Sequence, residues 1–315
     1  MLLHGHLENG ADKNPNLPFS EFEGNSLSYQ EANLLSNQLA NKLVSEGLEV
    51  GDRFAFLAKN CTEMAIMYYA ASKVGVVPVP LNYRLADQEW AYIINDSEAK
   101  LIIVKGNEYS DRINQISSEL KNIKKYISVS VDNSIEKFHN FYDWLSDSSN
   151  EKPTLKIHEN DDVYQMYTSG TTGHPKGAVL LQRNVAANIR QYLNSLTLPR
   201  PSRTLLVAPM YHAAAMINMC GCIAIGGTIV IQEDFIPQDV VDCLANEKIT
   251  HTVLVPAMIQ ACLVSVPNVA SNEYNDLDQI HYGASPIAPE TLKKAMDVFK
   301  CKFGQGFGMT ETVAV

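Results

Sequence analysis

The sequence predicts an α/β fold in which layered, mainly parallel sheets are flanked by helices. Short runs of β-branched and aliphatic residues alternate with longer helical patterns over most of the 315 residues. These short runs are continuously apolar, which is typical of parallel strands that helices cover on both faces. With 46% hydrophobic and 19% charged residues, the chain can bury a large core, and general disorder is excluded.

In the first half of the chain, glycine and proline separate the predicted elements. Gly75 ends a helical pattern, and Pro78 and Pro80 prevent the run that follows from being a helix. The predicted elements are a strand at 52–58, a helix at 63–73, an extended run at 76–81, a strand at 101–104 and a helix at about 111–120.

A polar segment at 132–162 interrupts this alternation. It is rich in Asp, Ser, Asn, Glu and Lys, it contains Pro153, and its aromatic patch at 138–144 predicts a short surface helix. We interpret the segment as a connector. The sequence therefore predicts a first α/β subdomain at 1–160 and a second at 161–315.

In the second half of the chain, the alternation of strands and helices resumes. The long apolar stretch at 213–231 is broken by Asn218 and by Gly226–Gly227, so a buried helix, a glycine turn and a strand fit it better than a membrane span. Strands are predicted at 163–167, 204–208, 228–231, 252–255 and 279–282.

The net charge limits the classes of binding partner, and the cysteine pattern indicates the cellular compartment. The 25 basic against 35 acidic residues give a net charge of -10, which argues against a nucleic-acid or anionic-membrane surface. The 6 cysteines have no zinc-site spacing and lie mostly in apolar runs, as expected of reduced thiols in the cytoplasm. The first residues lack the pattern of a signal peptide. A homodimer is compatible with the sequence.

The segment at 167–177 has the composition of a phosphate-binding loop. Its glycines allow backbone N–H groups to face an anion, its hydroxyls add neutral donors, and Lys176 adds a cation. A strand enters the loop, and a helix is expected from about Arg183, where ligands gather in open α/β sheets. The candidate residues are Thr168, Ser169, Gly170, Thr171, Thr172, Gly173 and Lys176.

Three other interpretations of this loop fit less well. A flexible solvent loop would more often contain Asp, Glu or Asn, none of which is present. A Walker A loop is disfavoured because Gly173 lies three residues before Lys176 and Gly177 follows it. No G-x-S-x-G elbow is present, which argues against a serine hydrolase.

Together with several other motifs, this loop resembles the adenylate-forming superfamily, which includes acyl- and aryl-CoA synthetases, peptide-synthetase adenylation domains and firefly-type luciferases. Tyr167-Thr-Ser-Gly-Thr-Thr-Gly-His-Pro-Lys-Gly177 resembles the family's phosphate loop. Gln305-Gly-Phe-Gly-Met-Thr-Glu311 resembles its second motif, and Tyr282-Gly-Ala-Ser285 resembles its adenine-side segment. Early motifs at 27–31, 50–53 and 73–84 match in family order, so the resemblance covers nearly the whole chain.

The resemblance implies a nucleotide-binding role for the residues of these motifs. Phe307, where the family more often has tyrosine, would stack on adenine, and Gly283 and Ala284 would let the backbone approach it. Thr310 would hydrogen-bond the α-phosphate, and Glu311 would hold Mg²⁺. Ser285, Gln305, Gly306 and Gly308 complete the implied nucleotide-binding set.

The resemblance also implies where the acid substrate binds. Pro209-Met-Tyr-His212 resembles the P-x-[FY]-H segment of acyl-CoA synthetases, which would place His212 near the carboxylate and the phosphoryl centre. The apolar residues nearby suit a fatty or aryl acid, whose tail would gain roughly 0.8 kcal/mol per buried CH₂. The implied substrate residues are His212, Met216, Pro256, Gly308 and Met309.

The activity that the resemblance implies is a two-step acid–thiol ligase reaction that uses ATP, Mg²⁺ and CoA. A carboxylic acid would become an acyl-adenylate and then a thioester, as in fatty acid metabolism. Two alternatives stay open: an amino-acid or aryl-acid adenylation domain serving a carrier protein, and a non-catalytic nucleotide-binding module. Family members continue beyond the position of Val315 with a ribose-binding aspartate and a C-terminal domain that carries a lysine. We therefore expect an N-terminal domain with little activity by itself.

Overall fold

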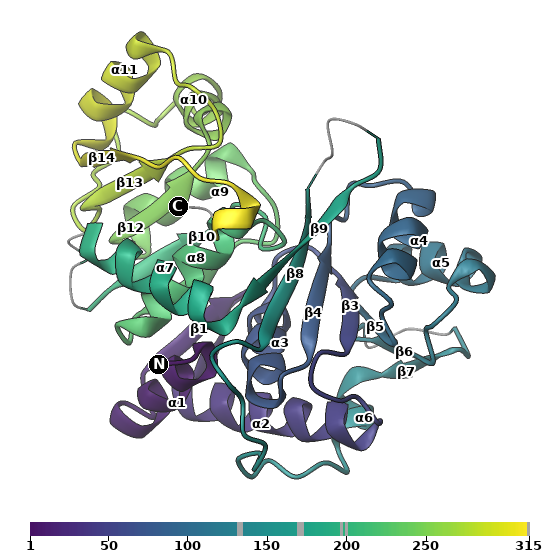
Figure 1. Cartoon of the computed structure of the whole chain (residues 1–315). Coiled ribbons are helices and arrows are strands. Elements are labelled where there is room, and N and C mark those ends of the chain that lie inside the picture. Colours follow the sequence, from purple (N-terminus) through teal and green to yellow (C-terminus); the bar gives the residue numbers. More distant parts are fainter. Residues whose placement is uncertain (131–134, 169–172, 196–197, 199–200, 314–315) are drawn as a thin grey trace. The chain divides into compact units, whose positions relative to one another are not determined.

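The computed structural model describes residues 1–130, 135–168, 173–195, 198 and 201–313, which form two compact units (Figure 1). Unit 1 consists of Met1–Glu8, Gln30–Lys59 and Glu63–Ala186; unit 2 consists of Asn9–Tyr29, Asn60–Thr62 and the chain from Ala187 onward. The units do not follow the predicted boundary between residues 160 and 161, because the segment carrying the phosphate loop packs on strands of unit 1.

Unit 1 contains a parallel sheet of five strands in the order β4-β3-β5-β6-β7. Pro78 and Pro80 lie in β4, an edge strand of this sheet, where the missing proline N–H groups remove no ladder bond. The strands are β3 (Arg53–Leu57), β4 (Val77–Leu81), β5 (Leu101–Val104), β6 (Lys125–Ser128) and β7 (Phe138–Asn140).

A separate antiparallel hairpin, β8 (Asp162–Thr168) and β9 (Lys176–Leu181), also belongs to unit 1, with β8 beside β4. Among the helices, α3 is buried along almost its whole length, as its apolar sequence predicts. The helices up to the end of the hairpin are α1 (Leu3–Lys13), α2 (Tyr29–Ser45), α3 (Thr62–Val74), α4 (Asp87–Asp96), α5 (Asn107–Gln115) and α6 (Phe141–Leu145).

Unit 2 contains a sheet of seven strands in the order β14-β13-β12-β10-β11-β1-β2. All neighbouring pairs are parallel except β1 and β2. The strands are β1 (Pro18–Phe22), β2 (Asn25–Ser28), β10 (Arg203–Leu206), β11 (Thr228–Ile231), β12 (His251–Leu254), β13 (Gln279–Tyr282) and β14 (Lys302–Gln305). The helices are α7 (Gln182–Ser195), which begins in unit 1, α8 (Ala213–Ala224), α9 (Pro237–Asn246), α10 (Pro256–Ser265) and α11 (Pro289–Phe299).

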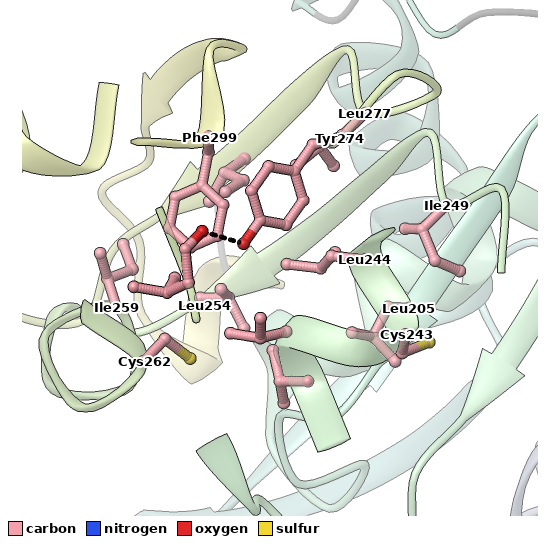
Figure 2. Close-up of a cluster of buried hydrophobic side chains, with 14 of the residues drawn as sticks. Leu205, Cys243, Leu244, Ile249, Leu254, Ile259, Cys262, Tyr274, Leu277 and Phe299 are labelled. Carbon is pink, nitrogen blue, oxygen red and sulfur yellow. Dashed lines mark hydrogen bonds between the residues drawn. The ribbon is translucent and has the colours of Figure 1, made fainter. Parts of the chain in front are cut away.

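The core of unit 2 lies between one face of its sheet and the helices α9, α10 and α11. Figure 2 shows this cluster, in which Phe299 packs edge-on against Tyr274 at a centroid distance of 5.0 Å. The Tyr274 hydroxyl donates a 2.7 Å hydrogen bond to the Val269 carbonyl, so the buried ring keeps its polar group satisfied.

Two hydrogen bonds to one buried amide oxygen link α7 and α8 to the sheet. Asn218 of α8 accepts a hydrogen bond from the Tyr192 hydroxyl at 2.8 Å and another from the Thr204 hydroxyl at 3.2 Å. The stretch at 213–231 forms α8, a turn with Gly226 at a φ of +76° and β11, as predicted. Within the described part of the chain, no helix is long and apolar enough to span a membrane.

Candidate functional site

The predicted phosphate loop connects the two strands of the hairpin β8–β9, so its immediate surroundings differ from the prediction. The helix expected from about Arg183 is α7, which begins at Gln182, but the strand β9 between the loop and this helix was not predicted. Four of the predicted phosphate-binding residues, Ser169, Gly170, Thr171 and Thr172, lie outside the described residues.

The described ends of the loop place Thr168 and Lys176 opposite each other in the hairpin. Thr168 and Lys176 are register partners in the hairpin, and the Thr168 hydroxyl donates to the Lys176 carbonyl at 3.4 Å. The Lys176 side chain is exposed and forms no ion pair within the described residues. Gly173 has a φ of +130° and open space where a Cβ would lie, so backbone conformation alone favours glycine there.

A glycine is needed at 177 for a steric reason, because two side chains occupy the space that a Cβ would fill. A Cβ at Gly177 would lie 2.3 Å from Gln165 Nε2 and 2.8 Å from Tyr167 Cζ. The Gln165 amide donates to the Tyr167 hydroxyl at 3.1 Å, and this hydroxyl donates to Asp96 of α4 at 2.6 Å. Burial and the nearby Asp96 carboxylate raise the pKa of Tyr167.

In unit 2, the two predicted nucleotide-binding segments meet at the carboxyl ends of adjacent parallel strands. Tyr282 ends β13, Gln305 ends β14, and the two residues are register partners. The Gly306 N–H donates to the Tyr282 carbonyl at 2.8 Å, and a Cβ at Gly283 would lie 2.6 Å from the Gly306 carbonyl oxygen. Glycine at 283 therefore permits the contact between the two segments.

The side chains beyond this contact are open to solvent. Ala284 has a φ of +67°, an unfavourable backbone region for a residue with a Cβ, and Ser285 is exposed. Phe307 is 84% exposed and Met309 is 52% exposed, which is unusual for large apolar side chains. The other predicted residues of this segment, Gln305, Gly306, Gly308 and Glu311, are also exposed, and Thr310 is partly exposed at the start of a short 3₁₀ turn, Thr310–Thr312.

His212 and Pro256 flank the point at which the strand order of this sheet reverses. The chain passes from β10 to β11 on one side and then returns through α9 to β12 on the other side of β10. His212 follows β10 and Pro256 follows β12, so both lie beyond carboxyl ends at the topological switch point, where open α/β sheets bind ligands.

The His212 side chain is exposed, and its role is not that of a helix cap. Its backbone occupies the position before α8, but its imidazole makes no capping hydrogen bond and packs on Tyr211 at a centroid distance of 4.4 Å. Met216, one turn into α8, is buried, with its sulfur 3.0 Å from that of Cys220. The substrate role predicted for Met216 therefore stays a prediction.

Sequence reasoning missed two histidines in the strands of this sheet, His251 in β12 and His281 in β13, of which His281 lies near Tyr192 of α7. His281 precedes the end of β13, and its ring fills the space where Gly304 has no side chain, with a Cβ there only 2.5 Å from the imidazole. Burial lowers the pKa of His281 to about 4 and that of His251 to about 3. No hydrogen bond to either Nε2 occurs among the described residues. A histidine within an apolar strand was the only signal in the sequence.

The donor set present suits Mg²⁺ only if the substrate supplies further ligands. No group of three or more His, Cys, Asp or Glu side chains that could hold a metal occurs among the described residues. Glu311 offers one exposed carboxylate without a hydrogen-bond partner in that part of the chain. Mg²⁺ commonly binds through one or two carboxylates together with substrate phosphates and water, so this carboxylate fits such a site.

A cavity of about 400 Å³ in unit 1 lies away from these residues. It lies near the amino ends of β3, β5 and β6, where Lys100 pairs with Asp52 at 2.6 Å. Neither end of the phosphate loop lines it, so we assign it no part in the candidate site.

Comparison with known proteins places these motifs in a family. The sequence pattern of the AMP-binding enzymes matches residues 7–315. The chain belongs to the AMP-binding enzyme family. Within this family it is 30% identical over 310 residues to the fatty acid–[acyl-carrier-protein] ligase ScoC of Streptomyces coeruleorubidus. It is 29% identical over 288 residues to the long-chain-fatty-acid–CoA ligase FadD13 of Mycobacterium tuberculosis.

The chain spans little more than half the length of these AMP-binding relatives. The alignments cover 96% of the chain and 57% of ScoC, and 91% of the chain and 55% of FadD13. Among solved structures, the inhibitor-bound N-terminal domain of FACL13 from Mycobacterium tuberculosis superimposes with a TM-score of 0.90 at 26% identity. That match covers 99% of this chain and 77% of the other, which confirms the predicted fold class.

Proposed function

We propose that this chain is the nucleotide- and acid-binding part of an ATP-dependent acid–thiol ligase. Its carboxylic acid substrate would be a fatty or aryl acid, and the thiol would be CoA. The observation that carries the proposal is the contact between Gly283 and Gly306, which joins two segments of nucleotide-binding type beside the exposed Phe307.

In the first step, the acid's carboxylate oxygen attacks the α-phosphorus of ATP, and the bond from that phosphorus to the pyrophosphate leaving group breaks. The proposed role of the protein is to orient the two reactants and to stabilise the developing negative charge. Lys176 and Thr168 would hold the triphosphate, supported by their opposed positions at the hairpin end. The predicted roles of residues 169–172 rest on the sequence alone.

The carboxyl edge of the seven-stranded sheet would hold the rest of the nucleotide. Phe307 offers an exposed ring for stacking on adenine, and Thr310 would donate a hydrogen bond to the α-phosphate. Glu311 would hold Mg²⁺, which, when bound, neutralises charge on phosphate oxygens. His212 at the switch point would orient the acid's carboxylate. The buried side chains of Met216 and Pro256 support the proposal that the acid has an apolar tail.

In the second step, a thiolate attacks the acyl carbon of the acyl-adenylate and AMP leaves. CoA is the proposed thiol, supported by the likeness to a ligase named for CoA. A carrier protein is the second candidate acceptor, because ScoC, at 30% identity, is named as an acyl-carrier-protein ligase. We propose the cytoplasm as the compartment, supported by the lack of disulfide bonds among the cysteines, all of which belong to the described residues.

An acid-dependent exchange of radioactive pyrophosphate into ATP tests this function. A panel of fatty, aryl and amino acids is assayed with the chain and with a longer product of the same gene, where the gene encodes one. We expect a fatty or aryl acid to give the fastest exchange, and Lys176→Met to slow it by about tenfold or more, since a charge-assisted hydrogen bond contributes about 1.5–3 kcal/mol. The proposal is wrong if no acid stimulates exchange in either protein.

A further inference from the structure

The imidazole of His174, within the phosphate loop, stacks on an aromatic ring of α4. Its ring centroid lies 4.6 Å from that of Tyr92, and the two planes are only 18° apart. His174 is exposed and lies two residues before Lys176, so the stack holds the end of the loop that leads into β9. Because His174 is exposed, packing of a hydrophobic core does not explain this stack.

The opposite end of the loop is attached to the same helix by a hydrogen bond. The Tyr167 hydroxyl, one residue before Thr168, donates to Asp96 at 2.6 Å. Asp96 lies one turn after Tyr92, and besides burial its carboxylate raises the pKa of Tyr92. Both ends of the loop therefore contact the five-residue stretch 92–96 of α4, although they come from different strands.

A chain of polar contacts fixes the Tyr167 ring in this position. Gln165 donates its amide to the Tyr167 hydroxyl and accepts a hydrogen bond from the Arg53 guanidinium at 3.3 Å. The glycine at 177 leaves room for the Tyr167 ring to cross β9. The loop end at β8 is therefore held to α4 through several hydrogen-bonded side chains. The loop end at β9 is held to α4 by the stack of His174 on Tyr92.

We propose that the Tyr92–His174 stack and the Tyr167–Asp96 hydrogen bond hold both loop ends against α4, so that Thr168 and Lys176 are held ready for a triphosphate. His174, Tyr92 and Asp96 are positioning residues in this proposal, and none of them touches the nucleotide. The inference rests on the proposed function for its ligand, and it adds residues that the sequence motif does not indicate. His174 in particular received no role from the sequence.

Binding of two nucleotides by the chain distinguishes positioning from general support of the fold. We expect His174→Ala and Tyr92→Ala each to weaken Mg·ATP binding about five- to tenfold, because an aromatic pair contributes about 0.5–1.5 kcal/mol. AMP, which lacks the β- and γ-phosphates, should bind within about twofold of the parent value. His174→Phe and Tyr92→Phe keep both rings and should bind ATP normally, and His139→Ala is the control for an exposed histidine in the same unit.

Combining the two alanine substitutions tests whether the rings act together. The double variant should lose no more ATP affinity than either single variant, because each removes the same contact. Equal losses of ATP and AMP affinity would contradict the proposal, as would ATP affinity that is unchanged in both single variants.

Hydrogen exchange without nucleotide tests the stack independently of the proposed function. The backbone amides of residues 173, 174, 176 and 177 should exchange several-fold faster in His174→Ala and Tyr92→Ala than in the parent, while the same amides should exchange at the parent rate in His139→Ala. Unchanged exchange in both stack variants would overturn the inference. If the parent chain binds no ATP but exchange does accelerate, the stack is confirmed and the proposed ligand is wrong.

Discussion

Gly283 and Gly306 lie so close that a single methyl group on Gly283 would come within 2.6 Å of the Gly306 carbonyl oxygen. The atom in the way belongs to the backbone, so it cannot rotate aside as a flexible side chain can. Gly283→Ala should therefore separate the ends of β13 and β14, lower the unfolding free energy by about 1–3 kcal/mol and weaken ATP binding. Thermal unfolding and nucleotide titration measure the two effects.

A matched control for this substitution is present in the same contact. A Cβ on Gly306 would meet no atom closer than 4.0 Å, so Gly306→Ala should leave the unfolding midpoint nearly unchanged. If both variants unfold at the parent temperature, the strand ends do not need the close approach that the structure shows.

Phe307 should contribute to nucleotide binding without contributing to stability. Because its ring is 84% exposed, removing it leaves no cavity. We expect Phe307→Ala to weaken ATP and AMP binding by about tenfold, since stacking of a base on an aromatic ring contributes about 1–3 kcal/mol. Phe307→Tyr keeps the ring and should bind like the parent. A loss of thermal stability in Phe307→Ala without a loss of affinity would contradict this role.

A substitution at His281 should compensate for the loss of stability caused by a substitution at Gly304. Gly304→Ala would place a methyl group 2.5 Å from the His281 ring, which is confined near Tyr192 at a centroid distance of 6.4 Å. We expect a destabilisation of about 1–3 kcal/mol, measured by urea unfolding. Adding His281→Ala creates space for the methyl group and should recover part of the loss. Strictly additive destabilisation would show that the ring is not the obstacle.

The buried histidines predict a loss of stability in mild acid. The folded-state pKa values of about 3 for His251 and about 4 for His281 lie below the ordinary value of 6.5, so the unfolded chain takes up protons first as the pH falls. The contribution of these two histidines to stability is constant above about pH 7, and each lowers stability by about 1.4 kcal/mol per pH unit below about pH 6.5. Urea midpoints between pH 7 and pH 5.5 measure this slope.

A substitution in unit 2 distinguishes the pH dependence caused by His251 from that caused by other titratable groups. His6 of unit 1, whose pKa burial lowers to about 4, acts in the same direction. His251→Gln removes one proton site from unit 2 and should flatten the slope by about one proton. An unchanged slope would mean that His251 titrates normally in the folded chain.

The sequence predicted the strands and helices whose apolar runs are continuous. The strand predicted at 52–58 is β3, and the run at 76–81, with Pro78 and Pro80, is the edge strand β4. Both elements are buried, so hydrophobic burial and local backbone preference favour the same structure. The residues that meet at Gly283 and Gly306 were also predicted, but from a family resemblance rather than from periodicity.

Three features were not predicted, for identifiable reasons. The strand β9 begins with Lys176 and Gly177, and its exposed, glycine-containing start does not show the apolar run of a parallel strand. The connector prediction at 132–162 missed β7, and the short helix predicted from the patch at 138–144 is α6, whose Phe141 and Trp144 are buried rather than on the surface. The stack of His174 on Tyr92 joins residues far apart in the chain, so no local pattern indicates it.

The pairing of β1 with β11 has a consequence for how the protein is made. The Thr228 hydroxyl donates to the Pro18 carbonyl across 210 positions of the chain, so the seven-stranded sheet closes only after both segments have left the ribosome. At translation rates of about 5–20 residues per second, the β1–β2 ribbon waits roughly 10 to 40 seconds for its neighbour. During that delay its unpaired edge is open to other chains, and binding by a molecular chaperone would protect it.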